Sequence, residues 1–312
     1  MIEQTKKVAG KDRNLRAGWK LEQKFVPYVF IAPFFIVFIL FFLGPALFAF
    51  FVSFQNWNLL GPMKFIGIKN YVLLFQDTTF FQALFNSVVY ISSALLVQWP
   101  LSLILATVLN QKHMPGKKFL TPVYFIPVLT SSVVVAIVFV LFLDKKYGLF
   151  NAPLISLGMQ PINWLGSTDL SKYAVILLLV WRWTGYNMIL FLATMQAIPE
   201  ELYEAAWVDG AGKLQSWWNI TIPMLRPAIA YVMIMGIIGG WQIFDEPWIL
   251  TNRGGPADSS LSIGNFLYRM SIQNVRMGYG SAIGTVLFVV ILIFTIVQLR
   301  FFGLYSREEQ LA

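Results

Sequence analysis

Apolar residues in this chain gather into long runs instead of alternating with polar residues. The uncharged runs occupy residues 25–63, 78–111, 119–143, 183–199, 227–244 and 277–299. Each approaches or exceeds the roughly 20 residues that a helix needs to cross a bilayer. The fourth run continues upstream past Arg182 to about Tyr173, and the fifth continues downstream past Asp245 to about Leu250. The pattern predicts an all-α integral membrane protein with six transmembrane helices.

The composition supports a membrane protein and excludes several kinds of site. Apolar residues make up 57% of the chain and charged residues 12%, whereas a soluble domain carries about 25% charged residues. The chain has no cysteine and a single histidine, His113, so disulfides, thiol nucleophiles and clustered zinc ligands are excluded. The acidic residues are too scattered for the catalytic cluster of an integral-membrane transferase. We therefore expect no catalytic residues, no metal site and no bound cofactor.

The distribution of Lys and Arg predicts the orientation in the membrane. Fourteen of these residues fall on the side of the N-terminal tail and eight on the opposite side. Because cytoplasmic loops are enriched in Lys and Arg, both termini are expected in the cytoplasm. We divide the chain into a cytoplasmic tail (1–24), a six-helix domain (25–305) and a second cytoplasmic tail (306–312). The basic first tail is too polar for a cleaved signal peptide, and its charge suits anionic lipid, not nucleic acid.

The cytoplasmic loop 198–227 predicts a pair of short helices. Pro199 suits the first helical position, and the two glutamates that follow it complement the positive end of the helix dipole. Asp209 and Gly210 supply a turn, and a second helix is expected from about 214 to 222, where Pro223 stops it. The spacing alone leaves open an amphipathic hairpin that lies on the membrane surface.

The same loop resembles the EAA loop by which permease subunits of bacterial ATP-binding-cassette (ABC) importers dock onto their ATPases. The residues that match are Glu204, Ala205, Ala206, Asp209, Gly210, Ala211, Ile220 and Pro223. Trp217 departs from the pattern, where the family usually has Phe. Residues 65–71 are similar to a stretch of carbohydrate-importer permeases, and residues 250–256 to a turn of their maltose-type branch, although this turn has one extra residue between Thr251 and the glycines. Residues 265–268 and 277–282 also look like that branch.

The resemblance implies a type I ABC importer permease fold in a bacterial plasma membrane. It implies four kinds of protein partner or solute: a second homologous permease, two ABC ATPase subunits, an extracytoplasmic solute-binding protein, and a sugar, oligosaccharide or polyol-type solute. No P-loop sequence occurs in the chain, so ATP and Mg would be used by the partner ATPases. Two other functions stay open on residues alone, an ion-gradient-driven secondary transporter and an integral-membrane transferase.

A solute path is expected along two helices. Trp181, Thr184, Gly185 and Met188 recur at three- and four-residue steps, so they share one face of the fourth helix. On the fifth helix, Trp241, Gln242 and Asp245 are expected to cluster. Aromatic rings beside a few hydrogen-bonding groups are suited to weak sugar binding. A stripe that only packs against other helices is the alternative.

Arg182 predicts an ion pair inside the membrane. A guanidinium in hydrocarbon is costly, so it must face water, the bundle interior or an opposite charge. Asp245 and Glu246 are within reach near the outer end of the fifth helix. We expect Arg182 to pair with one of them, either as part of an outer gate or as a purely structural contact.

The second helix is expected to face the bundle interior. It carries more polar groups than a lipid-facing helix would, namely Asn86, Ser87, Tyr90, Ser92, Ser93 and Gln98.

Overall fold

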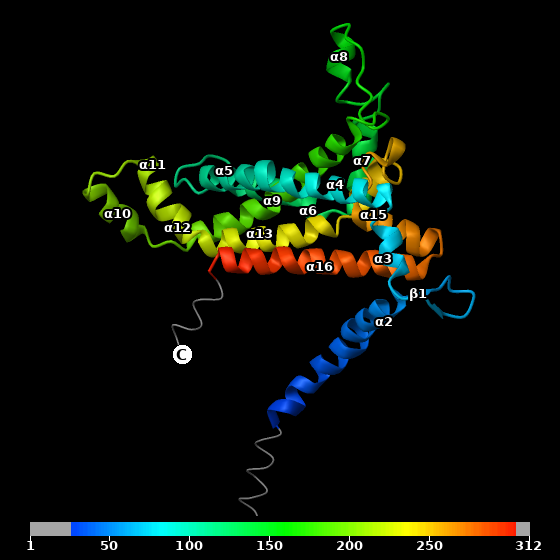
Figure 1. Cartoon of the computed structure of the whole chain (residues 1–312). Helices are drawn as coiled ribbons and strands as arrows, with labels where there is room; N and C mark the ends of the chain where they lie inside the picture. The colour runs from blue at the N-terminus through cyan, green and yellow to red at the C-terminus, as the bar shows by residue number, and fades with distance from the viewer. Residues whose placement is uncertain (1–25, 304–312) are drawn as a thin grey trace, which may run out of the picture.

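The computed structural model describes residues 26–303 of the 312-residue chain. The predicted tails 1–24 and 306–312 lie outside the described residues. Within the described part, the chain forms helices joined by turns, with one two-stranded hairpin. Figure 1 places α10 at one end of the helical bundle and α8 with the hairpin at the other end.

Helices that can cross a membrane dominate the fold. Four are long and apolar enough in the described part: Val26–Val52, Thr78–Leu109, Ser171–Gln196 and Met277–Phe301. Two bent pairs raise the number to six if each counts as one span: Lys117–Leu129 with Ser132–Phe142, and Lys213–Met224 with Arg226–Trp241. The six predicted spans agree with this larger number, except that Lys213–Met224 falls in the predicted loop 198–227 and Arg226–Trp241 alone matches the predicted fifth span.

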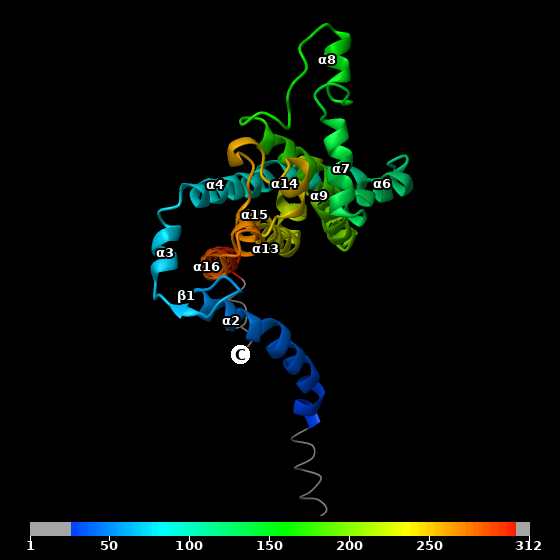
Figure 2. The ribbon, with the colours of Figure 1, turned by 90° about the vertical axis from the view of Figure 1, so that its right-hand side faces the viewer.

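The first span is one helix that stands apart from the others. It contains a π-helical turn, η1 (Ile39–Leu43), followed directly by α2 (Gly44–Val52). Figure 2 looks along α16 and shows this span leaving the bundle, with α2 beside α16. A short hairpin follows, in which β1 (Gln55–Asn56) pairs antiparallel with β2 (Lys64–Phe65).

The hairpin is tied to the helix that follows it, α3 (Lys69–Leu74). The amide nitrogen of Asn70 donates hydrogen bonds to the carbonyls of Ser53, at 2.8 Å, and Gln55, at 2.9 Å. Asn70 is buried, so its side chain supplies partners that these carbonyls would otherwise lack.

The second span consists of α4 (Thr78–Ser93), the π-helical turn η2 (Ala94–Gln98) and α5 (Trp99–Leu109). Asp77 caps its start, because its carboxylate accepts a hydrogen bond from the backbone N–H of Thr79.

The polar face of the second span lies against residues 258–261, in the connection between the fifth and sixth spans. Asn86 donates to the carbonyls of Asp258 and Leu261, and the hydroxyl of Tyr90 donates to the carbonyl of Ser260 at 2.7 Å. These bonds confirm that the second span faces the interior of the bundle.

The third run folds as two helices instead of one. The axes of α6 (Lys117–Leu129) and α7 (Ser132–Phe142) differ by 101°. Thr130 and Ser131 between them are extended. The hydroxyl of Thr130 donates to the carbonyl of Ile126, and the carbonyl of Thr130 accepts from Arg182. Side chains thus replace some of the backbone bonds that the break removes. Beyond α7, the connection to the fourth span contains a short helix, α8 (Ala152–Ser156).

The fourth span, α9 (Ser171–Gln196), is the centre of the bundle, because 56% of its most apolar 18-residue window is buried. It contacts α5, α6 and α13 (Arg226–Trp241). The last span, α16 (Met277–Phe301), packs along α13.

The fifth span ends earlier than its sequence predicts. The prediction of a helix continuing past Asp245 to about Leu250 is wrong, because α13 ends at Trp241 and a separate helix, α14 (Asp245–Leu250), begins after a three-residue break. In that break, Ser262 donates to the carbonyl of Ile243 at 2.8 Å. Asn265 donates to the carbonyl of Phe244 at 2.9 Å. These two side chains stabilise an interruption that would otherwise leave buried carbonyls unpaired.

The outer connection between the fifth and sixth spans is a compact set of turns. It contains η4 (Pro256–Asp258), α15 (Ile263–Tyr268) and η5 (Arg269–Gln273). An ion pair of Arg269 with Asp258, at 2.8 Å, closes it.

Candidate functional site

The first helix of the loop 198–227 is α10 (Glu200–Val208). Glu200 and Glu201 occupy its first turn, as predicted, whereas Pro199 is the residue just before the helix and not its first residue. At its end Gly210 adopts a φ of 83°. The N–H of Gly210 bonds to the carbonyl of Trp207, and the N–H of Ala211 to the carbonyl of Ala206. This is a Schellman cap, so Gly210 has a defined role in ending the helix.

The second helix of the loop is longer than predicted. It comprises α11 (Lys213–Ser216), the π-helical turn η3 (Trp217–Thr221) and α12 (Ile222–Met224). Pro223 does not stop it, because proline is accommodated at the start of α12. The chain instead turns by 62° between α12 and α13.

One side-chain contact joins the two helices of the loop, and two more fix the pair to the rest of the protein. The hydroxyl groups of Tyr203 and Thr221 lie 2.9 Å apart, which joins the two helices. The indole of Trp217 donates to the hydroxyl of Thr107 at 3.1 Å, which joins the pair to α5. Lys112 forms an exposed ion pair with Glu200. Displacing the loop would therefore pull on the C-terminal end of the second span.

The helix pair also presents apolar side chains to its surroundings, which we call the loop surface. Val208 is 88% exposed and Leu214 is 72% exposed. The other members of the loop surface are Leu202, Trp207 and Trp218. Glu204 and Asp209 are exposed beside it. An exposed apolar patch with charged neighbours is typical of a protein interaction site.

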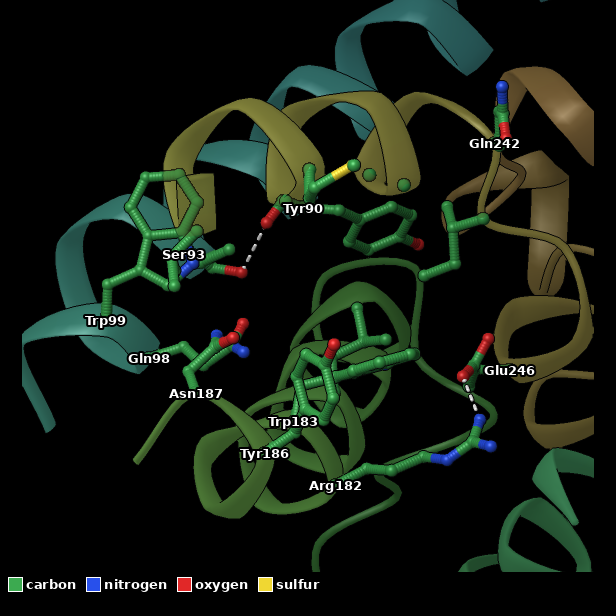
Figure 3. Close-up of a pocket in the computed structure, with 18 of the residues that line it drawn as sticks. Tyr90, Ser93, Gln98, Trp99, Arg182, Trp183, Tyr186, Asn187, Gln242 and Glu246 are labelled. Atoms are coloured by element: carbon green, nitrogen blue, oxygen red, sulfur yellow. Dashed lines mark hydrogen bonds and ion pairs between the residues drawn. The ribbon is translucent and has the colours of Figure 1, made fainter. Parts of the chain in front are cut away.

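A cavity of about 500 Å³ lies between α4, α9, α13 and the start of α14. Figure 3 shows Gln98 and Asn187 pointing into it, with Trp99 on one side and Arg182 on the other. Three half-exposed lining side chains border its open side: Trp183, Tyr231 and Met235.

The cavity wall combines aromatic rings with uncharged hydrogen-bonding groups. The aromatic members are Tyr90, Trp99, Trp183, Tyr186, Tyr231 and Phe244. The uncharged amide and hydroxyl members are Ser93, Gln98, Ser132, Asn187 and Gln242. Such a wall can place a flat ring against a sugar and hydrogen-bond its hydroxyl groups.

An ion pair lies at one end of the cavity (Figure 3). The guanidinium of Arg182 lies 2.6 Å from the carboxylate of Glu246, and both side chains are buried (Figure 3). The predicted pairing of Arg182 with an acid of this segment is therefore present, and Glu246 is the partner. Arg182 also donates to the carbonyl of Thr130 at 3.3 Å, where α6 ends. A cation at a helix C-terminus is favourable because carbonyls there lack partners.

Asp245, the second predicted acid, has a different partner. Its carboxylate accepts a hydrogen bond from the hydroxyl of Ser132, in the first turn of α7. The break between α6 and α7 and the break between α13 and α14 are thus joined through Arg182, Glu246 and Asp245. We call these three side chains, with Thr130 and Ser132, the break cluster.

Comparison with known proteins identifies the chain. Residues 98–303 match the family of binding-protein-dependent transport system inner membrane components. The chain belongs to this family. It is 38% identical to the arabinooligosaccharide transport permease AraP of Bacillus subtilis, over 94% of each chain. It is 33% identical to the trehalose/maltose transport permease MalF of Thermococcus litoralis, over 95% of this chain and 100% of that one.

The structural comparison gives the same result. A bacterial ABC transporter that imports the acidic polysaccharide alginate contains a chain that matches with a TM-score of 0.80 and 25% identity, covering 92% of this permease and 98% of that chain. The predicted resemblance and the type I ABC importer permease fold are therefore confirmed. This permease is an inner-membrane transport subunit and not an enzyme.

The predicted stripe on α9 lies away from the cavity. The ring of Trp181 contacts Phe139 of α7 at 5.3 Å between centroids, and the carbonyl of Thr184 accepts from Ser102. A side chain at Gly185 would lie 1.6 Å from the carbonyl oxygen of Tyr124 in α6, so this glycine lets α6 and α9 approach. Met188 is fully buried in the core. In this chain the stripe packs against neighbouring helices.

The three residues predicted together on the fifth helix are separated by its break. Trp241 is the last residue of α13 and packs its ring 5.7 Å from that of Phe294 in α16. Gln242 lies in the break and Asp245 begins α14, and both line the cavity. The prediction that the three share one helix is wrong, because α13 ends before Gln242.

The cavity contains residues that sequence reasoning did not select. Trp183, Tyr186, Asn187 and Leu190 form the opposite face of α9 at three- and four-residue steps. Asn187 is buried, and a carboxamide within an apolar span is a signal that could have identified this face. Gln98 and Ser93 were noted only as signs of interior packing. Among the residues that the structure describes, no group of three His, Asp or Glu side chains could hold a metal ion.

Proposed function

We propose that this permease forms the transmembrane path of an ATP-driven, binding-protein-dependent carbohydrate importer. Its relatives are named for the transport of arabinooligosaccharides and of trehalose and maltose, which supports a saccharide as the solute. A matching structure is of an alginate transporter in complex with a periplasmic binding protein, which supports a solute-binding partner. ATP and Mg are used by the partner ATPases.

The ATPases dock on the loop surface. The exposed apolar side chains of α10 and α11, together with Glu204, support this role. Ala205 and Gly210 leave the turn open to close approach, since nothing lies within 4 Å of a side chain placed at Gly210. The bond from Trp217 to Thr107 connects the docked loop to α5, which ends the span that lines the cavity. A movement of the ATPases is thereby transmitted to the cavity wall.

The cavity is the part of the path that contacts sugar. Its open side, at Trp183, Tyr231 and Met235, is closed by a second homologous permease. The break cluster forms the outer gate, because it holds together two interrupted spans at one end of the cavity. Opening that end requires the contacts of Arg182 and Asp245 to separate.

The permease lies in a bacterial plasma membrane with both termini and the loop surface in the cytoplasm. The excess of Lys and Arg on that side supports this orientation. Contacts with membrane lipid cover the exposed apolar side chains of the first span.

Reversing one charge beside the loop surface tests the docking role. Glu204→Lys, assembled with its ATPases and binding protein in proteoliposomes, is expected to insert normally and to lose solute-stimulated ATP hydrolysis. Gln215→Lys, an exposed substitution on the second helix, serves as the matched control for added charge. Solute-stimulated hydrolysis that is unchanged in Glu204→Lys would contradict the docking role.

A further inference from the structure

The cavity wall carries an uneven set of charges. Among the described residues that line it, Arg182 is the basic side chain, and Asp245 and Glu246 are the carboxylates. With all three ionised, the wall has a formal charge of minus one. The formal charge of the cavity wall is therefore opposite in sign to the net charge of the whole chain, which is +8.

The one basic side chain among the described residues of the cavity wall, Arg182, is already paired with an acid. Arg182 Nη1 donates to Glu246 at 2.6 Å, and Nη2 donates to the carbonyl of Thr130 at 3.3 Å. Its Nε atom is buried and has no hydrogen-bond partner. The guanidinium also lies 5.4 Å from the centroid of the Trp183 ring. The charge of Arg182 is thus compensated by Glu246, and its side chain is only 11% exposed.

The two carboxylates lie where a negative charge is favoured. Asp245 and Glu246 form the first turn of α14, and Asp245 accepts from the hydroxyl of Ser132. Neither the serine nor the helix terminus contributes a full positive charge, so the charge of Asp245 is not cancelled. An anionic group entering the cavity would meet this carboxylate without meeting a free cation.

We infer that the cavity admits neutral saccharides and excludes acidic ones, and that Glu246 sets this selectivity by neutralising Arg182. The inference rests on the proposed transport of carbohydrate through this cavity. The comparisons do not decide whether the solute is neutral or acidic. AraP is named for arabinooligosaccharides, whereas the transporter in the matched structure imports an acidic polysaccharide. The uncharged groups of the wall, such as Gln98 and Asn187, bind sugar hydroxyls without regard to charge.

The absence of cysteine from the chain allows a direct test. Ser93→Cys places one thiol in the cavity wall, and Ser156→Cys places one on the exposed helix α8 as the matched control. The assembled importer in detergent is treated with an anionic sulfonate methanethiosulfonate and with a cationic ammonium methanethiosulfonate. We expect the anionic-to-cationic rate ratio at position 93 to be at least about tenfold lower than at position 156.

Variants of the three charged side chains then show which of them sets the selectivity between anionic and cationic reagents. Glu246→Gln frees Arg182 and is expected to raise the ratio at position 93 about tenfold, whereas Arg182→Met is expected to lower it further. Asp245→Asn removes one charge while its amide can still accept from Ser132, so it provides a second variant if Glu246→Gln does not fold. Equal ratios at positions 93 and 156, or a ratio that neither Glu246→Gln nor Asp245→Asn raises, would overturn the inference. This reactivity does not require transport, so loss of sugar uptake with the charge pattern intact would count against the proposed function alone.

Discussion

Arg182 Nη1 and Glu246 Oε1 lie 2.6 Å apart, with side-chain exposures of only 11% and 7%. Removing one partner of such a pair leaves a buried charge uncompensated, which costs about 3–5 kcal/mol. We therefore expect the assembled importer with Arg182→Met to unfold at a measurably lower temperature than the native importer. In Arg182→Met/Glu246→Leu, where no charge remains unpaired, most of that stability should return.

The double variant separates a gate from a structural contact. If the pair holds the outer gate, the stable double variant should take up sugar at a much lower or an uncontrolled rate in proteoliposomes. Native uptake by a stable double variant would mean that the contact is structural. Loss of assembly in both variants would also end the gating proposal.

Two glycines of the loop 198–227 provide a matched pair of substitutions. Gly210 has a φ of 83°, whereas Gly212 has a φ of −72°, and nothing lies within 4 Å of a side chain at either position. Gly210→Ala should strain the Schellman cap by about 1–2 kcal/mol and reduce solute-stimulated ATP hydrolysis. Gly212→Ala should have little effect. Equal hydrolysis rates in the two variants would show that the cap geometry does not matter for docking.

The contact between α6 and α9 predicts a large effect at Gly185. An added methyl group would lie 1.6 Å from the backbone carbonyl oxygen of Tyr124, which cannot move without moving α6. Gly185→Ala should lower the free energy of unfolding by about 2 kcal/mol or more, which a thermal unfolding measurement would detect. Gly239→Ala is the control, because it is also helical and nothing lies within 4 Å of its added methyl group. A Gly185→Ala variant as stable as the control would contradict the close approach of these helices.

The two faces of α9 lead to opposite predictions for two neighbouring tryptophans. Trp183 lines the cavity, whereas Trp181 packs on Phe139. If the cavity passes the sugar, Trp183→Ala should reduce the uptake rate several-fold through loss of stacking, and Trp181→Ala should leave uptake near the native rate. Measuring uptake at equal amounts of assembled importer removes differences in stability. The reverse result would restore the stripe of Trp181, Thr184, Gly185 and Met188 as the solute path.

Much of the fold follows from features that are local in sequence. The apolar runs predict the spans, since a bilayer requires about 20 apolar residues in a row. The Asp209–Gly210 turn follows equally well, because glycine tolerates a positive φ. The resemblance of the loop to an EAA loop identified the family, which the comparisons confirm.

The two helix breaks could not be predicted in the same way. At Thr130 and at Ile243 the backbone leaves the helix because side chains from distant segments supply its hydrogen bonds, Arg182 in one case and Ser262 in the other. No local sequence pattern indicates which distant side chains will supply these hydrogen bonds. For the same reason, periodicity grouped Trp181 with Met188 correctly on one face of α9 but could not tell which face borders the cavity.

The π-helical turns have a consequence for how related sequences are compared. Three of them, η1, η2 and η3, end two residues before a proline, at Pro45, Pro100 and Pro223. Each accommodates one additional residue in the helix, and one residue corresponds to a rotation of about 100°. A helical wheel that assumes a regular α-helix through one of these turns therefore misplaces every later residue of that helix by about 100°. Alignments of transporter sequences that lack such a turn should carry a one-residue gap at that point.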